Sequence, residues 1–116
     1  MPPKGPYKLV TVNTSPERAW RLVGIVVEDL KARYSIQHQA NCATIDEVEQ
    51  TVEEIRPDVL FCASMWAPEE SKRIQNIARA IVPDIKILAL PYGIQVAKGP
   101  DAVLDFLKQQ IPELLG

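Results

Sequence analysis

The sequence predicts a three-layer α/β sandwich around a parallel sheet, formed by one domain that spans residues 1–116. Short apolar segments rich in β-branched residues alternate along the chain with longer segments of helical periodicity. The segments between successive strands are long enough for helical crossovers, which connect parallel strands. A chain of 116 residues is also long enough to bury one hydrophobic core.

The first strand and helix follow a proline-rich start. Residues 1–6 include three prolines and are expected to form a flexible lead-in, whereas Tyr7–Asn13 is apolar and β-branched and is expected to form a strand. Thr14 or Ser15 is expected to cap the helix that follows, which should end at about Arg33. The apolar positions of this helix recur three and four residues apart and are expected to face the core: Trp20, Val23, Val27 and Leu30.

The second strand is expected at Ser35–Ala43, where apolar and polar residues alternate. So polar a pattern is typical of a strand at the edge of a sheet. A capping box is expected to start the next helix at Thr44, with Glu47 three residues later, and this helix should end at about Arg56. The residues expected to share one face of the strand are Ile36, His38, Ala40 and Cys42.

The second half of the chain continues the alternation. The expected elements are the strand Asp58–Ser64, the helix Ala67–Val82, the strand Asp84–Leu90 and the C-terminal helix Gly99–Ile111. This order predicts a flavodoxin-like sandwich with strand order 2-1-3-4, in which the polar second strand lies at an edge. Ile94–Lys98 is expected to form either a short antiparallel fifth strand or an irregular loop, because too few residues precede it for a parallel crossover.

Composition excludes several classes of function. The net charge is −2 and no basic run is present, which argues against nucleic-acid and membrane partners. The longest apolar stretch is too short to span a bilayer, and the N-terminus lacks the apolar segment of a signal peptide. A cytoplasmic location is therefore expected. No metal and no cofactor are expected, because the single histidine cannot form a zinc site by itself.

Four residues that attract attention have structural interpretations. Cys42 and Cys62 are expected to be buried free thiols, because the first strand would separate them by about 9–10 Å, beyond disulfide reach. His38 shares a strand face with apolar residues and is expected to be structural rather than a catalytic base. Gly24 is unfavourable within a helix, which indicates a close approach to the sheet or to another subunit.

Three stretches resemble response-regulator receiver domains. RPDVLFCASMWAP (56–68) resembles their third strand, in which a similar run ends on the aspartate that accepts the phosphoryl group. PDIKILAL (83–90) resembles their fourth strand, and VAKGPDAVLDFL (96–107) is similar to the lysine–proline junction before their last helix. The resemblance implies a flavodoxin-like fold and a role in signalling or regulation.

The chemistry implied by the resemblance is missing. Asn13 and Thr14 occupy the places of the acids that bind magnesium, and Ala63 occupies the place of the phosphorylated aspartate. Lys98 matches the family lysine, but the usual fourth helix and fifth strand are not expected before it. The resemblance therefore implies a pseudo-receiver: a non-enzymatic module that acts by protein–protein contact or as a homodimer, without phosphotransfer.

The candidate site lies where the parallel strands end, because open α/β sheets bind ligands beyond these ends. The expected rim for a ligand or partner consists of Asn13, Ser15, Ser64, Met65, Trp66 and Tyr92. The polar members suit a small pocket, although Ser15 can equally be a simple helix cap. Met65 and Trp66 favour a partner contact if they are exposed and core packing if they are buried.

A second hypothesis is a small-molecule binding domain of the same fold, for cobalamin, flavin or a phosphorylated metabolite. The segment 45–64 is similar to cobalamin-binding domains, but their cobalt-ligating histidine motif after the first strand is absent. An enzyme is the least supported class, because the sequence places no basic side chain beside Ser64 or the two thiols that could activate them as nucleophiles.

Overall fold

The computed structural model describes residues 2–116 and contains a four-stranded, all-parallel sheet with the order β2-β1-β3-β4. The predicted fold class, strand order and C-terminal helix are confirmed. The elements are β1 (Lys4–Val12), α1 (Pro16–Leu30), β2 (Tyr34–Cys42), the 3-10 turn η1 (Ile45–Glu47), α2 (Val48–Ile55), β3 (Val59–Cys62), α3 (Pro68–Ile81), β4 (Lys86–Ala89), α4 (Ile94–Lys98) and α5 (Pro100–Leu115).

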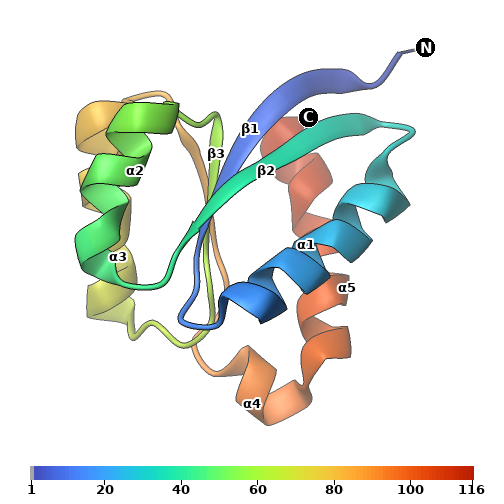
Figure 1. The fold of residues 1–116 in the computed structure, drawn as a ribbon. Helices are drawn as coiled ribbons and strands as arrows, with labels where there is room; N and C mark the ends of the chain where they lie inside the picture. Colours follow the sequence, from blue (N-terminus) through green and yellow to red (C-terminus); the bar gives the residue numbers. More distant parts are fainter. Residues whose placement is uncertain (1) are drawn as a thin grey trace.

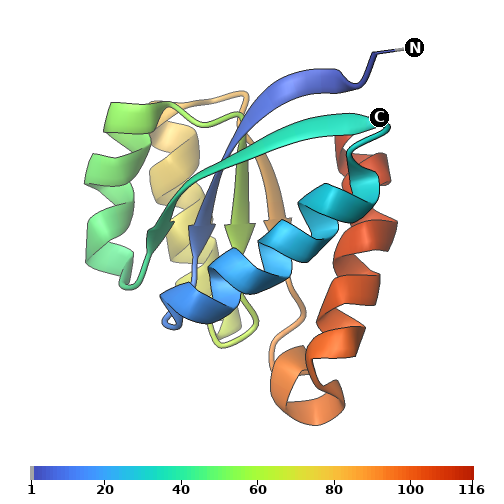
Figure 2. The ribbon, with the colours of Figure 1, turned by 45° about the vertical axis from the view of Figure 1, so that its right-hand side comes forward.

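The sheet forms the middle layer of a three-layer sandwich (Figure 1). Helices α2 and α3 cover one face, and α1 and α5 cover the other. All four strands run toward the end of the molecule where α4 lies, as Figure 2 shows. The loops after β1, β3 and β4 therefore meet near α4.

The central strand β3 joins two hydrophobic cores. All four of its residues are buried, and alternate side chains enter opposite layers. Val59 and Phe61 pack in the core under α1 and α5, whereas Leu60 and Cys62 pack in the core under α2 and α3. Burial on both faces explains why this strand is apolar throughout.

The edge strand β2 contains a bulge that changes which face its residues occupy. Leu9 of β1 pairs with His38, but the next residue, Val10, pairs with Ala40, so Gln39 is an extra residue in β2. Ile36 and His38 consequently lie on the α1 side of the sheet, whereas Ala40 and Cys42 lie on the α2 side. The edge position is confirmed, but the expected common face of these four residues is wrong.

The ends of several elements differ from expectation. Strand β1 starts at Lys4, whose backbone N–H donates to the Arg33 carbonyl oxygen at 2.9 Å, so a flexible lead-in through residue 6 is wrong. Helix α1 ends at Leu30, before the expected Arg33. Thr44 forms no capping bond to the backbone; its hydroxyl donates to the Glu47 carboxylate at 3.3 Å, and the first turn is a 3-10 turn.

Ile94–Lys98 is a short helix, so both expectations for this segment, a fifth strand and an irregular loop, are wrong. Glycines bound it on both sides: Gly93 has φ 81° and Gly99 has φ 83°, values that favour glycine. The Ala97 N–H donates to the Gly93 carbonyl oxygen at 2.8 Å, which closes the helical turn. The two glycines let the chain enter and leave this turn sharply, whereas a strand would have required an extended path.

Gly24 is exposed in the middle of α1, and a Cβ added there would meet nothing within 4 Å. Close approach to the sheet therefore does not explain this glycine. We expect Gly24→Ala to raise the free energy of unfolding by about 0.5–1 kcal/mol, because alanine loses less backbone entropy in a helix. Urea unfolding of both proteins measures this change; an unchanged or lower stability would contradict it.

Candidate site at the carboxyl ends of the strands

Three loops meet at the end of the sheet where the strands terminate, as predicted. The Ala63 N–H donates to the Val12 carbonyl oxygen at 3.1 Å, which joins the loop after β3 to the end of β1. The Gly93 N–H donates to the Ser64 carbonyl oxygen at 2.9 Å, which joins the loop after β4 to the loop after β3. These backbone bonds place the expected rim residues in one region, which we call the rim.

Trp66 is a core residue, so of the two interpretations left open for it, core packing is confirmed and an exposed partner contact is wrong. Only 8% of its surface is exposed, and its indole N–H donates to the Val12 carbonyl oxygen at 2.8 Å. The ring packs in the core under α2 and α3, with buried Val12 and Ile74 among its members. The indole therefore satisfies a backbone acceptor at the end of β1 and closes this end of the core.

Asn13 organises the start of α1. Its side-chain Oδ1 accepts the Ser15 N–H at 2.8 Å, and its carbonyl oxygen accepts the Asn41 amide at 3.0 Å. Ser15 occupies the cap position but makes no side-chain capping bond, and Thr14 is exposed. Asn13 thus shapes the turn between β1 and α1, and a cap role for the Ser15 hydroxyl is wrong.

A groove of about 440 Å³ opens at the rim. Met65 and Tyr92 of the predicted set line it, and so does Ser64, of which only 5% is exposed. The lining is completed by Gly93, of the loop after β4, and by four residues that sequence reasoning did not assign to the site: Arg18, Gln95, Val96 and Ala97. Arg18 lies in the first turn of α1, which begins just after the loop that follows β1. The expected start of this helix could therefore have indicated that Arg18 lies at the rim.

A deeper space of about 20 Å³ lies beside this groove, and the two share four lining residues: Arg18, Ser64, Met65 and Gln95. Asn13, which is 7% exposed, lines the deeper space as well. Apolar side chains form the rest of its wall, among them Leu22 and Val103. No acidic residue and no histidine lines either space within residues 2–116.

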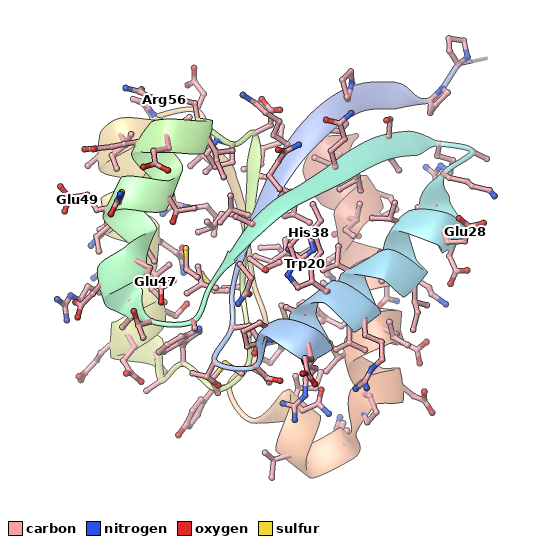
Figure 3. All side chains as sticks on the ribbon, in the orientation of Figure 1. Trp20, Glu28, His38, Glu47, Glu49 and Arg56 are labelled. Atoms are coloured by element: carbon pink, nitrogen blue, oxygen red, sulfur yellow. The ribbon has the colours of Figure 1, made fainter. Side chains whose placement is uncertain are left out.

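Trp20 and His38 form a separate cluster on the outer edge of the α1 face, where Figure 3 shows the two rings beside each other. Their ring centroids are 3.8 Å apart. Trp20 is 45% exposed, so its expected core position is wrong. The Thr11 hydroxyl donates to Asn41 Oδ1 at 2.7 Å and therefore accepts from His38 Nε2 at 2.8 Å.

This arrangement keeps His38 neutral. Burial lowers its pKa to about 4, and a close approach to the Ala40 backbone opposes that shift only in part. His38 Nδ1 is shielded from solvent and has no hydrogen-bond partner among residues 2–116. A histidine with these properties supports the structural interpretation, because a general base needs a pKa close to the working pH.

The two cysteines are free and buried, as predicted. Burial raises the pKa of Cys62 to about 12 and also raises the pKa of Cys42, so neither is a thiolate at neutral pH. We expect the folded protein to react with no equivalent of Ellman's reagent at pH 8 and the unfolded protein to react through both thiols. Rapid reaction of the folded protein would contradict the burial of these side chains.

Residues 2–116 contain neither a metal-ligand cluster nor a membrane-spanning helix. No group of three or more His, Cys, Asp or Glu side chains is placed to hold a metal ion. None of the helices in this range combines the length and the apolar character needed to cross a membrane.

Comparison with known proteins adds no family to these observations. The chain matches no protein-family model, and it matches no curated protein in sequence.

Proposed function

We propose that this domain is a non-enzymatic, receiver-like regulatory module that acts by protein–protein contact at the rim groove. The observation that carries the proposal is the exposure of two apolar residues beside the groove. Tyr92 is 66% exposed and Val96 is 92% exposed, more than any other large hydrophobic residue within residues 2–116. Exposed aromatic and aliphatic side chains next to a concave surface favour a protein interface.

The chemistry of the rim supports a role without phosphotransfer. Asn13 is a turn residue, and Ala63, at the place of the receiver phospho-acceptor, has no group that can carry a phosphoryl. Ser64 and Tyr92 are the hydroxyl-bearing residues that line the groove within residues 2–116, and no carboxylate or histidine lines it to activate either hydroxyl. Incubation with acetyl phosphate or beryllofluoride is therefore expected to leave the mass and the spectrum of the protein unchanged. A stable adduct would contradict the proposal.

Site-specific photo-cross-linking tests the contact itself. A benzophenone amino acid in place of Tyr92 is expected to yield a discrete adduct, with either a second copy of the chain or another protein. The same probe in place of Ile25, 41% exposed on α1, serves as the matched control. Val96→Glu should abolish the adduct without unfolding the protein, because this side chain is almost fully exposed. Equal products from both probe positions would refute the proposal.

A second candidate function is the binding of a small molecule at the rim, which one specific observation favours. Only 5% of the Ser64 residue is exposed, and its hydroxyl, which makes no hydrogen bond with residues 2–116, opens onto the groove. A polar side chain in this state is ready to bind a ligand group. Native mass spectrometry and the visible absorption of purified protein would reveal a retained ligand, including a flavin or a corrin.

A further inference from the structure

We infer that the rim pocket receives a carboxylate with a single negative charge, carried by an apolar group, and that Arg18 supplies the matching positive charge. This inference rests on the second candidate function, small-molecule binding at the rim. It adds the chemical class of the ligand and the residues that recognise it. Four polar side chains carry the argument: Asn13, Arg18, Ser64 and Gln95.

Two of these side chains are buried and offer unused hydrogen-bonding groups. Ser64 is 5% exposed, and its backbone carbonyl already accepts the Gly93 N–H, so its position is held while its hydroxyl stays available. Asn13 is 7% exposed, and Oδ1 is occupied by the Ser15 N–H. The Asn13 Nδ2 group makes no hydrogen bond with residues 2–116, so it is a free donor beside the deeper space. Both side chains can donate to an oxygen placed there.

Arg18 provides the charge. It lines both the groove and the deeper space, and it forms no ion pair or hydrogen bond with residues 2–116. It lies in the first turn of α1, where the helix dipole also favours an anion. No acidic side chain lines the pocket to neutralise the guanidinium. The pocket therefore has a positive charge without an internal partner.

The balance of charge and polarity favours a carboxylate over a phosphate. One cation lines the pocket within residues 2–116, and the other polar groups, on Asn13, Ser64 and Gln95, are neutral. A guanidinium pairs with a planar carboxylate through two parallel hydrogen bonds, so the single positive charge of the pocket neutralises it. A phosphate dianion would retain one negative charge that no side chain of the pocket neutralises. The deeper space of about 20 Å³ suits one small polar group.

The apolar part of the ligand would lie in the outer groove. Met65, Tyr92 and Val96 line this larger space, whose volume of about 440 Å³ is in the range of small-molecule sites. These side chains present apolar surface next to the polar end formed by Arg18 and Ser64. An amphipathic carboxylic acid with a flat or aliphatic body matches this arrangement. Its carboxylate would contact the polar side chains, and its body would contact the apolar ones.

The test is an NMR titration of ¹⁵N-labelled protein with phenylacetate. Phenylacetamide, which has the same shape without the charge, and inorganic phosphate are titrated in parallel. We expect phenylacetate to shift the amide signals of Ser64, Met65 and Gln95. Arg18→Gln should weaken its binding by roughly tenfold or more, because a hydrogen-bonded ion pair is lost. The matched control is Arg21→Gln, which changes an exposed arginine of the same helix that lines neither space.

Each alternative outcome overturns the inference in a distinguishable way. Equal binding of phenylacetamide, or tighter binding of phosphate, would refute the carboxylate while leaving small-molecule binding at the rim in place. An equal loss in Arg18→Gln and Arg21→Gln would refute the role of Arg18. Binding of none of the three probes would refute the carboxylate site and count against the second candidate function as well. The comparison of phenylacetate with phenylacetamide uses the wild-type protein, so it holds even if Arg18→Gln fails to fold.

Discussion

Trp66→Ala is expected to lower the free energy of unfolding by about 3–5 kcal/mol. The indole is 8% exposed, and its loss would open a cavity in the core under α2 and α3. The Val12 carbonyl oxygen would also lose the indole N–H, which now donates to it at 2.8 Å. Urea unfolding followed by circular dichroism measures the change.

Two further variants show whether packing or contact explains the effect. Trp66→Phe keeps most of the apolar volume and removes the hydrogen bond, so it should lose less stability than Trp66→Ala, about 1–3 kcal/mol. Tyr92→Ala should change the stability by no more than about 0.5 kcal/mol, because Tyr92 is 66% exposed. A Trp66→Ala protein as stable as the wild type would show that Trp66 is not a core residue.

Stability is expected to fall as the pH decreases from about 6.5 to about 4, in part because of His38. Burial lowers the pKa of the folded histidine to about 4, whereas in the unfolded chain it takes up a proton near its ordinary value of 6.5. Between these values the unfolded state binds more protons, so acid favours unfolding. The contribution of His38 to the free energy of unfolding is fully present above about pH 6.5. It declines as the pH falls from about 6.5 to about 4, and it does not change further below about pH 4.

Protonation of His38 is expected to lower the free energy of unfolding by about 1–2 kcal/mol over this pH range. This is less than the whole difference between the two pKa values would give, because solvent screens a partly exposed ring. His38→Gln provides the control, because glutamine does not titrate and can still donate to Thr11. The fall in unfolding free energy between pH 7 and pH 4.5 should be smaller in this variant by that amount. Parallel pH profiles for the two proteins would contradict a lowered pKa of His38.

The place of the candidate site could be predicted because it depends on topology. Parallel strands joined by helices end at one edge of the sheet, so the loops after β1, β3 and β4 meet there whatever their sequence. Asn13, Ser64 and Tyr92 could therefore be assigned to the rim from their order in the chain. Gln95 could not, because its position depends on the α4 turn, which two glycines with positive φ allow.

The burial of individual aromatic residues could not be predicted from periodicity. Trp20 has the spacing of a core residue, but it lies at the outer edge of α1, where the polar side chain of His38 covers one face of its ring. Trp66 follows a strand in a loop, a position typical of exposed residues, but the Val12 carbonyl oxygen, which also accepts the Ala63 N–H, lies within reach of its indole N–H. In both cases the deciding contact joins residues that are distant in the chain.

The sequence by itself determined the fold class, the strand order, the edge position of β2 and the burial of both cysteines. These features follow from local patterns: strand and helix periods, chain length between strands, and the polarity of one strand. Only the tertiary structure decided the bulge at Gln39, the helical state of 94–98 and the pocket formed by Arg18 with Ser64. These features depend on register and on contacts between distant segments, whose energies do not appear in any short stretch of sequence.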